Sequence, residues 1–199
     1  TISGNLQGGI VFNGTGTRNN KIEANKIGTD FTGTTYVSNH TGVLIKSQSN
    51  SNIIGGNSLN GERNIISGNL EIGVYIEASD SNVVTGNFIG PDVTGMAGFD
   101  NNDTLIQANG MEFNTVAKHN RLGGPSVGER NIVSGNRVYG AIYYGNASYN
   151  TIENNYIGTD SAGVNPLPNA TGICVDGGSN HNPIINNLLS GNISYGIFI

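Results

Sequence analysis

Three aspartates recur in one local phrase whose chemistry could bind calcium. Asp30, Asp92 and Asp160 each close an Ile-Gly-x-Asp block and are followed three residues later by glycine. On every second strand of a stack the copies would stand about 9.6 Å apart, too far for calcium–oxygen bonds of about 2.4 Å to bridge two of them. Each loop would need its own ligand shell, and only the middle one adds acidic side chains, Asp100 and Asp103. We therefore predict Asx turns, no metal and no cofactor, with calcium binding at these aspartates as the alternative.

A second set of side chains could bind or cut a polysaccharide. Its members occupy outward positions of short Gly-φ-x-φ segments, where φ is an apolar residue: Tyr75, Glu77, Glu112, Tyr144 and Asp176. If these segments are paired strands, Tyr75 lies beside Glu112, and Glu77 lies diagonal to Glu112 at roughly 7 Å. That separation is at the lower end of the inverting-glycosidase range. Tyrosine rings and acceptor oxygens also suit sugar binding without catalysis. We predict a ligand-binding ribbon with no catalytic residue assigned; an acid/base pair of Glu77 and Glu112, or a salt bridge of Glu77 with Lys46, are the alternatives.

The remaining charged motifs have simpler interpretations. Glu62-Arg63 and Glu129-Arg130 are adjacent opposite charges in glycine-flanked loops, and such pairs usually fold a loop against its own strand or stay solvated. The one basic cluster, Lys118, His119 and Arg121, precedes and follows an asparagine turn and is predicted to be solvated.

The elements that position these residues are repeats. A phrase running from Ser-Gly-Asn to Ile-Gly-x-Asp begins near residues 3, 67 and 134, and a half-period divides it. Glycines opening the Gly-φ-x-φ segments mark this half-period: Gly9, Gly42, Gly73, Gly110, Gly140, Gly172 and Gly196. Asparagines close the same stretches: Asn20, Asn52, Asn82, Asn120, Asn150 and Asn182. A unit of about thirty residues repeated along the chain is the signature of a solenoid.

Composition limits the kind of solenoid and its partners. With 36% hydrophobic residues, 31 Gly, no Trp and 12% charged residues, the chain lacks the content of helical repeats. A net charge of -5 argues against nucleic acid as a partner. No apolar segment is long enough to insert in a membrane, and the single Cys174 forms no intrachain disulfide. Thr1 starts mid-phrase and Ile199 ends mid-strand, so we expect a piece of a longer array.

Alternation within each turn predicts which side chains enter the core. In Gly73–Glu77, Val74 and Ile76 point inward while Tyr75 and Glu77 point outward. The equivalent inward pairs run through every turn to Ile197 and Ile199. A second inward set follows the asparagines: Ile22, Ile54, Val84, Leu122, Ile152 and Ile184, then Ile27, Ile66, Ile89, Ile132 and Ile157. The asparagines suit tight corners, where their amides can stack as a ladder. Parallel crossovers are right-handed in about 98% of cases, so we predict an all-β fold, a right-handed parallel β-helix of about six to seven turns, forming one domain over residues 1–199.

Two kinds of loop decorate alternate turns. One follows Ile-Gly-x-Asp at Gly28 to His40, Gly90 to Thr104 and Gly158 to Ala170; the other spans Gly55 to Asn64 and Gly123 to Asn131. The second loop is lost between Pro183 and Asn192. We expect the two kinds to form two separate rows along the coil.

Several phrases resemble a known group of proteins. Asn64-Ile65-Ile66-Ser67-Gly68-Asn69, Asn87-Phe88-Ile89-Gly90-Pro91-Asp92 and Gly128-Glu129-Arg130-Asn131-Ile132 are similar to repeats of extracellular bacterial right-handed parallel β-helix proteins, which share the pectate-lyase-like fold. The resemblance implies a secreted or cell-surface protein. Members serve in adhesion, surface structure and polysaccharide processing, and the catalytic signatures of the enzyme branches are absent here. We therefore expect a non-catalytic structural or adhesive module that binds polysaccharide or copies of itself. A polysaccharide hydrolase or lyase with its site on the outward face is the alternative.

Overall fold

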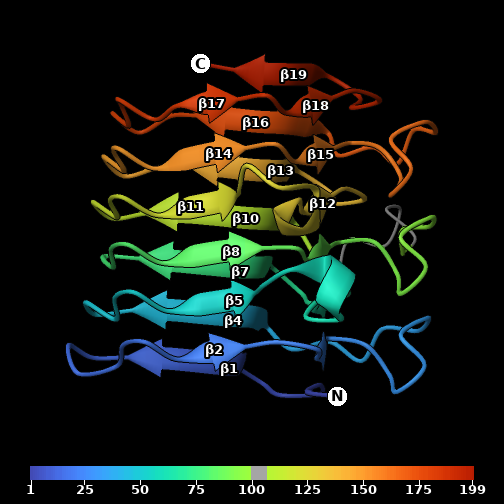
Figure 1. The fold of residues 1–199 in the computed structure, drawn as a ribbon, viewed down its shortest axis with the longest axis horizontal. Helices are drawn as coiled ribbons and strands as arrows, with labels where there is room; N and C mark the ends of the chain where they lie inside the picture. The colour runs from blue at the N-terminus through green and yellow to red at the C-terminus, as the bar shows by residue number, and fades with distance from the viewer. Residues whose placement is uncertain (100–106) are drawn as a thin grey trace.

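The computed structural model describes residues 1–99 and 107–199 as a coil of short strands (Figure 1). Each full turn contributes one strand to each of three sheets, and every pairing between strands of neighbouring turns is parallel. The first sheet contains β1 (Gly8–Asn13), β4 (Thr41–Lys46), β7 (Ile72–Glu77), β10 (Asn109–Asn114), β13 (Tyr139–Tyr143), β16 (Thr171–Val175) and β19 (Tyr195–Phe198). The predicted parallel β-helix is therefore confirmed.

The other two sheets consist of shorter strands. The second contains β2 (Lys21–Ile22), β5 (Ile53–Gly55), β8 (Val83–Thr85), β11 (Arg121–Gly123), β14 (Thr151–Glu153) and β17 (Ile184–Ile185). The third contains β3 (Lys26–Ile27), β6 (Ile65–Ile66), β9 (Phe88–Ile89), β12 (Ile132–Val133), β15 (Tyr156–Ile157) and β18 (Leu188–Leu189). Two 3₁₀ helices, η1 (Ser58–Asn60) and η2 (Val127–Glu129), lie in the loops between the second and third sheets. Neither helix is long or apolar enough to cross a membrane, considering the described part of the chain.

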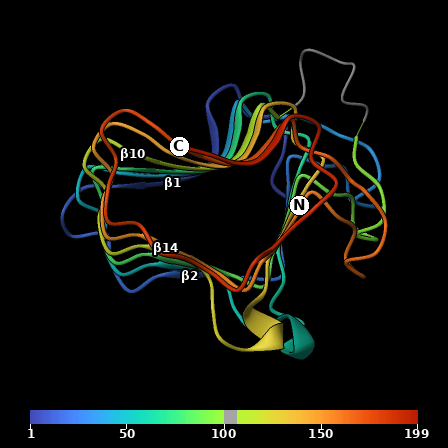
Figure 2. The ribbon, with the colours of Figure 1, turned by 90° about the horizontal axis from the view of Figure 1, so that it is seen from above.

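The coil is right-handed. Seen from the C-terminal end, the chain passes from β1 round the left side to β2 and then to the third sheet, rising toward the viewer as it turns counter-clockwise (Figure 2). The two chain ends lie at opposite ends of the coil axis (Figure 1).

Inward side chains stack on their counterparts one turn away. Val43 faces Val74, Ile45 faces Ile76, and all four are fully buried. Phe113 and Tyr143 stack with ring centroids 5.1 Å apart. The predicted inward positions are thus confirmed with two exceptions. On the third sheet Ile132 was expected in the core, but it pairs with Phe88 and Tyr156 on the outer face and its neighbour Val133 takes the inward position. On the last strand Ile197 and Ile199 are 43% and 88% exposed. They were expected in the core, but β19 pairs only with β16 and no described turn covers its other side.

Asparagine amides form three continuous rows along the axis. At the predicted corner, Asn52 donates its Nδ2 to Asn82 Oδ1 at 3.2 Å, and Asn82 donates to Asn120 Oδ1 at 3.1 Å. The two further rows start at Asn25 and Asn5. The second row continues through Asn64, Asn87, Asn131, Asn155 and Asn187. The third continues through Asn39, Asn69, Gln107, Asn136, Asn169 and Asn192. The corner role predicted for asparagine therefore applies to all three bends of the coil.

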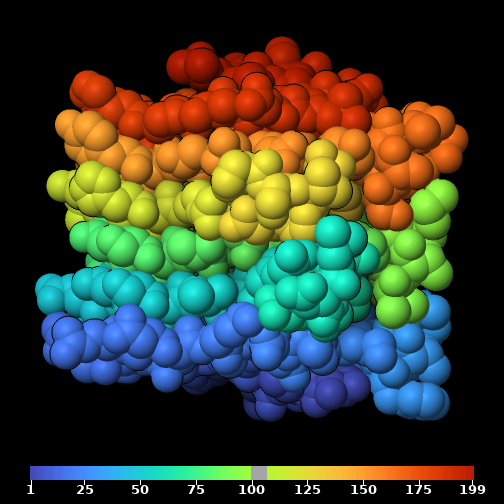
Figure 3. All heavy atoms as spheres, in the orientation of Figure 1, coloured from blue at the N-terminus to red at the C-terminus, as the bar shows by residue number. Residues whose placement is uncertain are grey.

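The two kinds of loop form two rows on different sides of the coil, as predicted (Figure 2). The Asp loops, which carry Asp30, Asp92 and Asp160, are hydrogen-bonded to one another: Val93 N donates to Gly33 O at 3.1 Å, and Ser161 N to Gly95 O at 2.8 Å. The Gly-Glu-Arg loops, which carry η1 and η2, also lie against each other and stand out from the surface (Figure 3). Each row therefore spans several turns as a continuous ridge.

Candidate functional site

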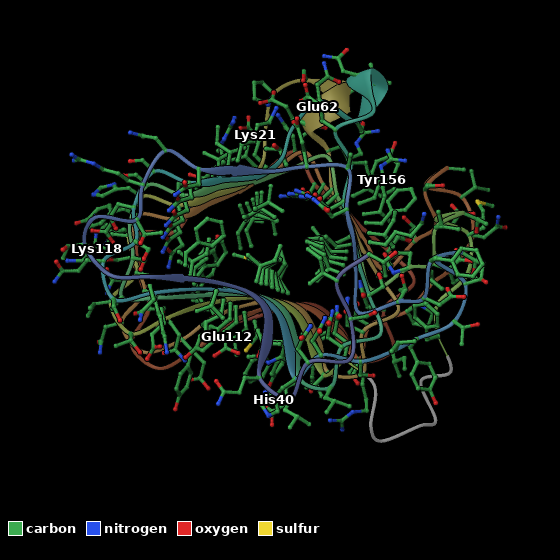
Figure 4. The ribbon with its side chains drawn as sticks, turned by 90° about the horizontal axis from the view of Figure 1, so that it is seen from below. Lys21, His40, Glu62, Glu112, Lys118 and Tyr156 are labelled. Atoms are coloured by element: carbon green, nitrogen blue, oxygen red, sulfur yellow. The ribbon has the colours of Figure 1, made fainter. Side chains whose placement is uncertain are left out.

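Three of the five predicted ligand-binding residues lie within strands of the first sheet, on its outer face. Tyr75 pairs with Glu112 across β7 and β10, and Glu77 pairs with Asn114 in the same ladder. Glu77 is therefore diagonal to Glu112, so the predicted register is confirmed. Glu112 lies on the side of the coil opposite to Lys21 and Glu62 (Figure 4).

The Glu112 carboxylate is held by two amides of its own strand. Asn114 Nδ2 donates to Oε1 at 2.8 Å, and Asn109 Nδ2 donates to Oε2 at 3.2 Å. Both oxygens therefore act as acceptors, whereas a general acid must present a proton to a leaving group. Glu77 forms no ion pair with Lys46 or any other described residue, so the alternative of a Lys46–Glu77 salt bridge is wrong.

Tyr75 is half-buried beside these carboxylates. Burial raises the pKa of its phenol to about 12, and the nearby charges of Glu77 and Glu112 add to the effect, while a hydrogen bond with Asn114 opposes it. The phenol stays protonated and serves as a rigid ring with a polar tip. Asn109 and Asn114 complete this cluster. The sequence does not mark them as partners of Glu112. They stand at the two ends of β10, and asparagine is too common in this chain to be distinctive there.

Tyr144 and Asp176 lie just beyond the ends of β13 and β16 and continue the ladder by one turn each: Tyr144 N donates to Phe113 O at 2.9 Å, and Asp176 N donates to Tyr143 O at 2.9 Å. Tyr144 is 46% exposed and its ring packs over Gly177, where an added Cβ would stand 2.9 Å from Cδ2. Asp176 Oδ1 accepts a hydrogen bond from Gly177 N at 2.6 Å.

The outward ribbon is not uniform between these residues. Ile142 and Cys174 occupy outward positions of β13 and β16 in register with Glu112, but they are only 8% and 1% exposed. Tyr139, on the same face, interacts with the Cys174 thiol, and burial raises the pKa of that thiol. The row of Tyr75 and Glu112 is thus continued by the covered side chains Ile142 and Cys174, whereas the row of Glu77 and Asn114 is continued by Tyr144 and Asp176.

The carboxylates of the three loop aspartates accept hydrogen bonds from their own loops. Asp30 Oδ1 accepts from Gly33 N at 2.9 Å and from Thr32 Oγ1 at 2.8 Å, and this hydroxyl is the main cause of the lowered pKa of Asp30. Asp160 Oδ1 accepts from the amide of residue 164 at 3.0 Å, the main cause of the lowered pKa of Asp160. Asp92 accepts from the amide and hydroxyl of residue 94.

These contacts confirm the predicted Asx turns. Within residues 1–99 and 107–199, no three His, Cys, Asp or Glu side chains are placed to hold a metal ion. Asp100 and Asp103 lie outside the described residues.

In each Glu-Arg pair the glutamate and the arginine point to different faces of the coil. Glu62 accepts from Asn57 N at 2.7 Å, so it folds its loop as predicted. Arg63 instead places its guanidinium 3.9 Å from the Phe88 ring centroid, and Arg130 lies 4.0 Å from that of Tyr156. Sequence reasoning missed these contacts. The sequence contains one sign of them. Each Glu-Arg pair is followed, at nearly the same distance along the chain, by an aromatic residue directly before Ile-Gly.

The predicted basic cluster is dispersed. Arg121 Nη2 pairs with Glu129 Oε1 at 3.0 Å on the second sheet. His119 instead stacks on Tyr149 with centroids 5.5 Å apart, and Tyr149 stacks on His181 at 5.1 Å. Lys118 lies at the corner of the coil between the first and second sheets (Figure 4). These residues do not form a shared site.

Comparisons of the chain with protein-family models, with curated proteins and with solved structures found no match. The three parallel sheets identify the fold as a parallel β-helix.

Proposed function

We propose that this protein is a non-catalytic β-helical rod that binds an extended carbohydrate on the outer face of its first sheet. The observation that carries the proposal is the fixed cluster of Tyr75, Glu112, Asn109 and Asn114. It offers an aromatic ring, carboxylate acceptors and amide groups on a flat, preformed surface. Sugar rings are recognised by such combinations of stacking and directed polar contacts.

Affinity in this proposal comes from repetition along the rod. A single aromatic contact contributes on the order of 1 kcal/mol, so one cluster binds weakly. A long chain that engages both the Tyr75–Glu112 cluster and the Tyr144–Asp176 pair binds more tightly, because the second contact is intramolecular. The alternative within the same non-catalytic role is that copies of the protein bind one another instead of a glycan.

The decisive experiment removes both rings. We expect the double variant Tyr75→Ala/Tyr144→Ala to lose binding in affinity electrophoresis against a panel of neutral polysaccharides while keeping its melting temperature, because neither ring lies in the core. Tyr149→Ala is the matched control, since Tyr149 is 49% exposed at another corner of the coil. Retained binding in the double variant, or equal loss in the control, would refute the proposal.

Polysaccharide cleavage is the second candidate, favoured by the diagonal placement of Glu77 and Glu112. A reducing-end assay on the same panel separates the two candidates. Product release that Glu112→Gln stops, with binding retained, would replace the binding function by an enzymatic one.

We further propose that the protein belongs among bacterial secreted or cell-surface β-helix proteins of the pectate-lyase-like group. Support comes from the Ser-Gly-Asn and Ile-Gly-x-Asp phrases, which resemble the repeats of that group, and from the parallel coil they form. An adhesive or surface-structural role fits a rigid rod with two ridges of loops. Localisation of the protein in fractionated cells tests this assignment.

A further inference from the structure

A groove runs along the outer face of the third sheet, away from the surface described above. Its floor is a ladder of paired outward side chains in consecutive turns: Ile65, Phe88, Ile132 and Tyr156. The Asp loops form one wall and the Gly-Glu-Arg loops the other (Figure 3), and Tyr156 lies between them (Figure 4). Hollows of ≈ 270 and ≈ 120 Å³ in the groove share Arg63 in their linings.

Two arginines are fixed in this groove with most of their donors unused. Arg63 lies over Phe88 and donates Nε to Gly86 O at 3.2 Å. Arg130 lies over Tyr156, donates Nε to Asn154 O at 3.2 Å and Nη2 to Asn154 Oδ1 at 3.2 Å. A guanidinium has five N–H donors. The ring and the carbonyl set the plane of each guanidinium and leave terminal N–H groups for a ligand.

Neither arginine has an acidic partner. The ion pairs in the described part of the chain involve Lys21, His40 and Arg121, and none includes Arg63, Arg130 or Lys26. The adjacent glutamates turn away, Glu62 to Lys21 and Glu129 to Arg121, on the second sheet. Both arginines are half-buried, and burial lowers the pKa of Arg63. A partly desolvated cation without a counter-charge is stabilised by an anionic ligand.

We propose that this groove binds a linear polyanionic glycan, with Arg63 and Arg130 each holding one sulfate or carboxylate group. Planar guanidinium groups bind such oxyanions through two parallel hydrogen bonds. The aromatic partners Phe88 and Tyr156 are two turns apart, about 9.6 Å if turns are spaced like paired strands, so anionic groups repeated along a polymer can reach both arginines. Lys26 lies in the same groove, one turn before Ile65.

Other polyanions suit the groove less well. An extended acidic peptide would gain most by adding to an open sheet edge, but the floor strands β6, β9, β12 and β15 are paired on both sides. Nucleic acid demands a broad basic surface, and the chain carries a net charge of -5. A glycan needs only anionic groups at a suitable spacing.

The test compares two double variants with the same change in net charge. Arg63→Gln/Arg130→Gln removes the groove cations, and Arg18→Gln/Arg137→Gln removes two exposed arginines elsewhere. Binding to dextran sulfate, carboxymethyl dextran and uncharged dextran is measured by calorimetry at one fixed salt concentration. We expect binding to one or both charged polymers, which distinguishes sulfate from carboxylate, and none to dextran. The groove variant should bind about 100-fold more weakly, at about tenfold per arginine, and the control less than about threefold.

Several outcomes would overturn the proposal. Equal weakening in both double variants would show general charge attraction, and binding to uncharged dextran would show that charge is not recognised. Tighter binding of poly-glutamate than of either charged dextran would assign the groove to an acidic peptide. If the groove variant does not fold, Lys26→Gln replaces it, because loss of that half-buried cation must also weaken binding. Tyr75→Ala/Tyr144→Ala leaves this binding unchanged, so the groove and the first-sheet surface are tested separately.

Discussion

Replacing Asn120 by alanine tests whether the asparagine rows stabilise the coil. Its Oδ1 accepts from Asn82 N at 2.8 Å and from Asn82 Nδ2 at 3.1 Å. Its Nδ2 donates to Ser79 O at 3.0 Å and to Asn150 Oδ1 at 2.9 Å. All the donors and acceptors of the buried amide are therefore used. At about 1 kcal/mol net for each hydrogen bond, Asn120→Ala should lower the free energy of unfolding by about 4 kcal/mol.

The expected loss of stability in Asn120→Ala also has a cause in the neighbouring residue, Asn82. The Asn82 backbone N–H and one N–H of its amide would be left buried without an acceptor, and water has no access because Asn82 is fully buried. Urea denaturation followed by circular dichroism measures the change. Asn60→Ala is the control, since Asn60 is exposed in η1 and its substitution should cost less than about 0.5 kcal/mol. A denaturation midpoint for Asn120→Ala equal to that of the parent, or equal costs for both variants, would refute the role of the rows.

Two further predictions concern the Asp loops. Because the pKa values of Asp30 and Asp160 are lowered in the folded protein, their contribution to stability is present above the ordinary aspartate pKa and is lost as the pH falls through the lower, folded values. Acid titration of the melting temperature should therefore show a smaller loss in Asp30→Asn/Asp160→Asn than in the parent, and identical acid curves would contradict this. We also expect a chelator to leave the melting temperature unchanged, since the carboxylates are occupied by their own loops; a sharp drop would identify them as calcium ligands.

The repeat pattern predicted the fold in detail because each turn uses the same few interactions. Gly73–Glu77 predicted both the inward pair and the register of Tyr75 with Glu112, since alternation and parallel stacking leave little freedom. The third asparagine row was missed in part because Gln107 replaces asparagine in it. An amide one methylene longer performs the same role there, which a search for asparagine alone does not detect.

The outward surfaces could not be predicted to the same depth. Alternation shows that a side chain points away from the core, but it does not show what covers that side chain. Cys174 is outward and yet buried, because neighbouring side chains cover it. Arg63 and Phe88 meet only because a loop of one turn reaches over a strand of the next. Such contacts depend on loop conformation, which the repeat does not determine.

The placement of the chain ends at opposite ends of the axis has a mechanical consequence (Figure 1). Tension applied between the termini pulls along the direction of the hydrogen bonds that join successive turns, so it loads one turn at a time and peels the coil from an end. Each turn of about thirty residues released as extended chain adds roughly 100 Å of length at about 3.4 Å per residue. Under pulling, the coil therefore lengthens in discrete steps of one turn, which limits the force that it transmits.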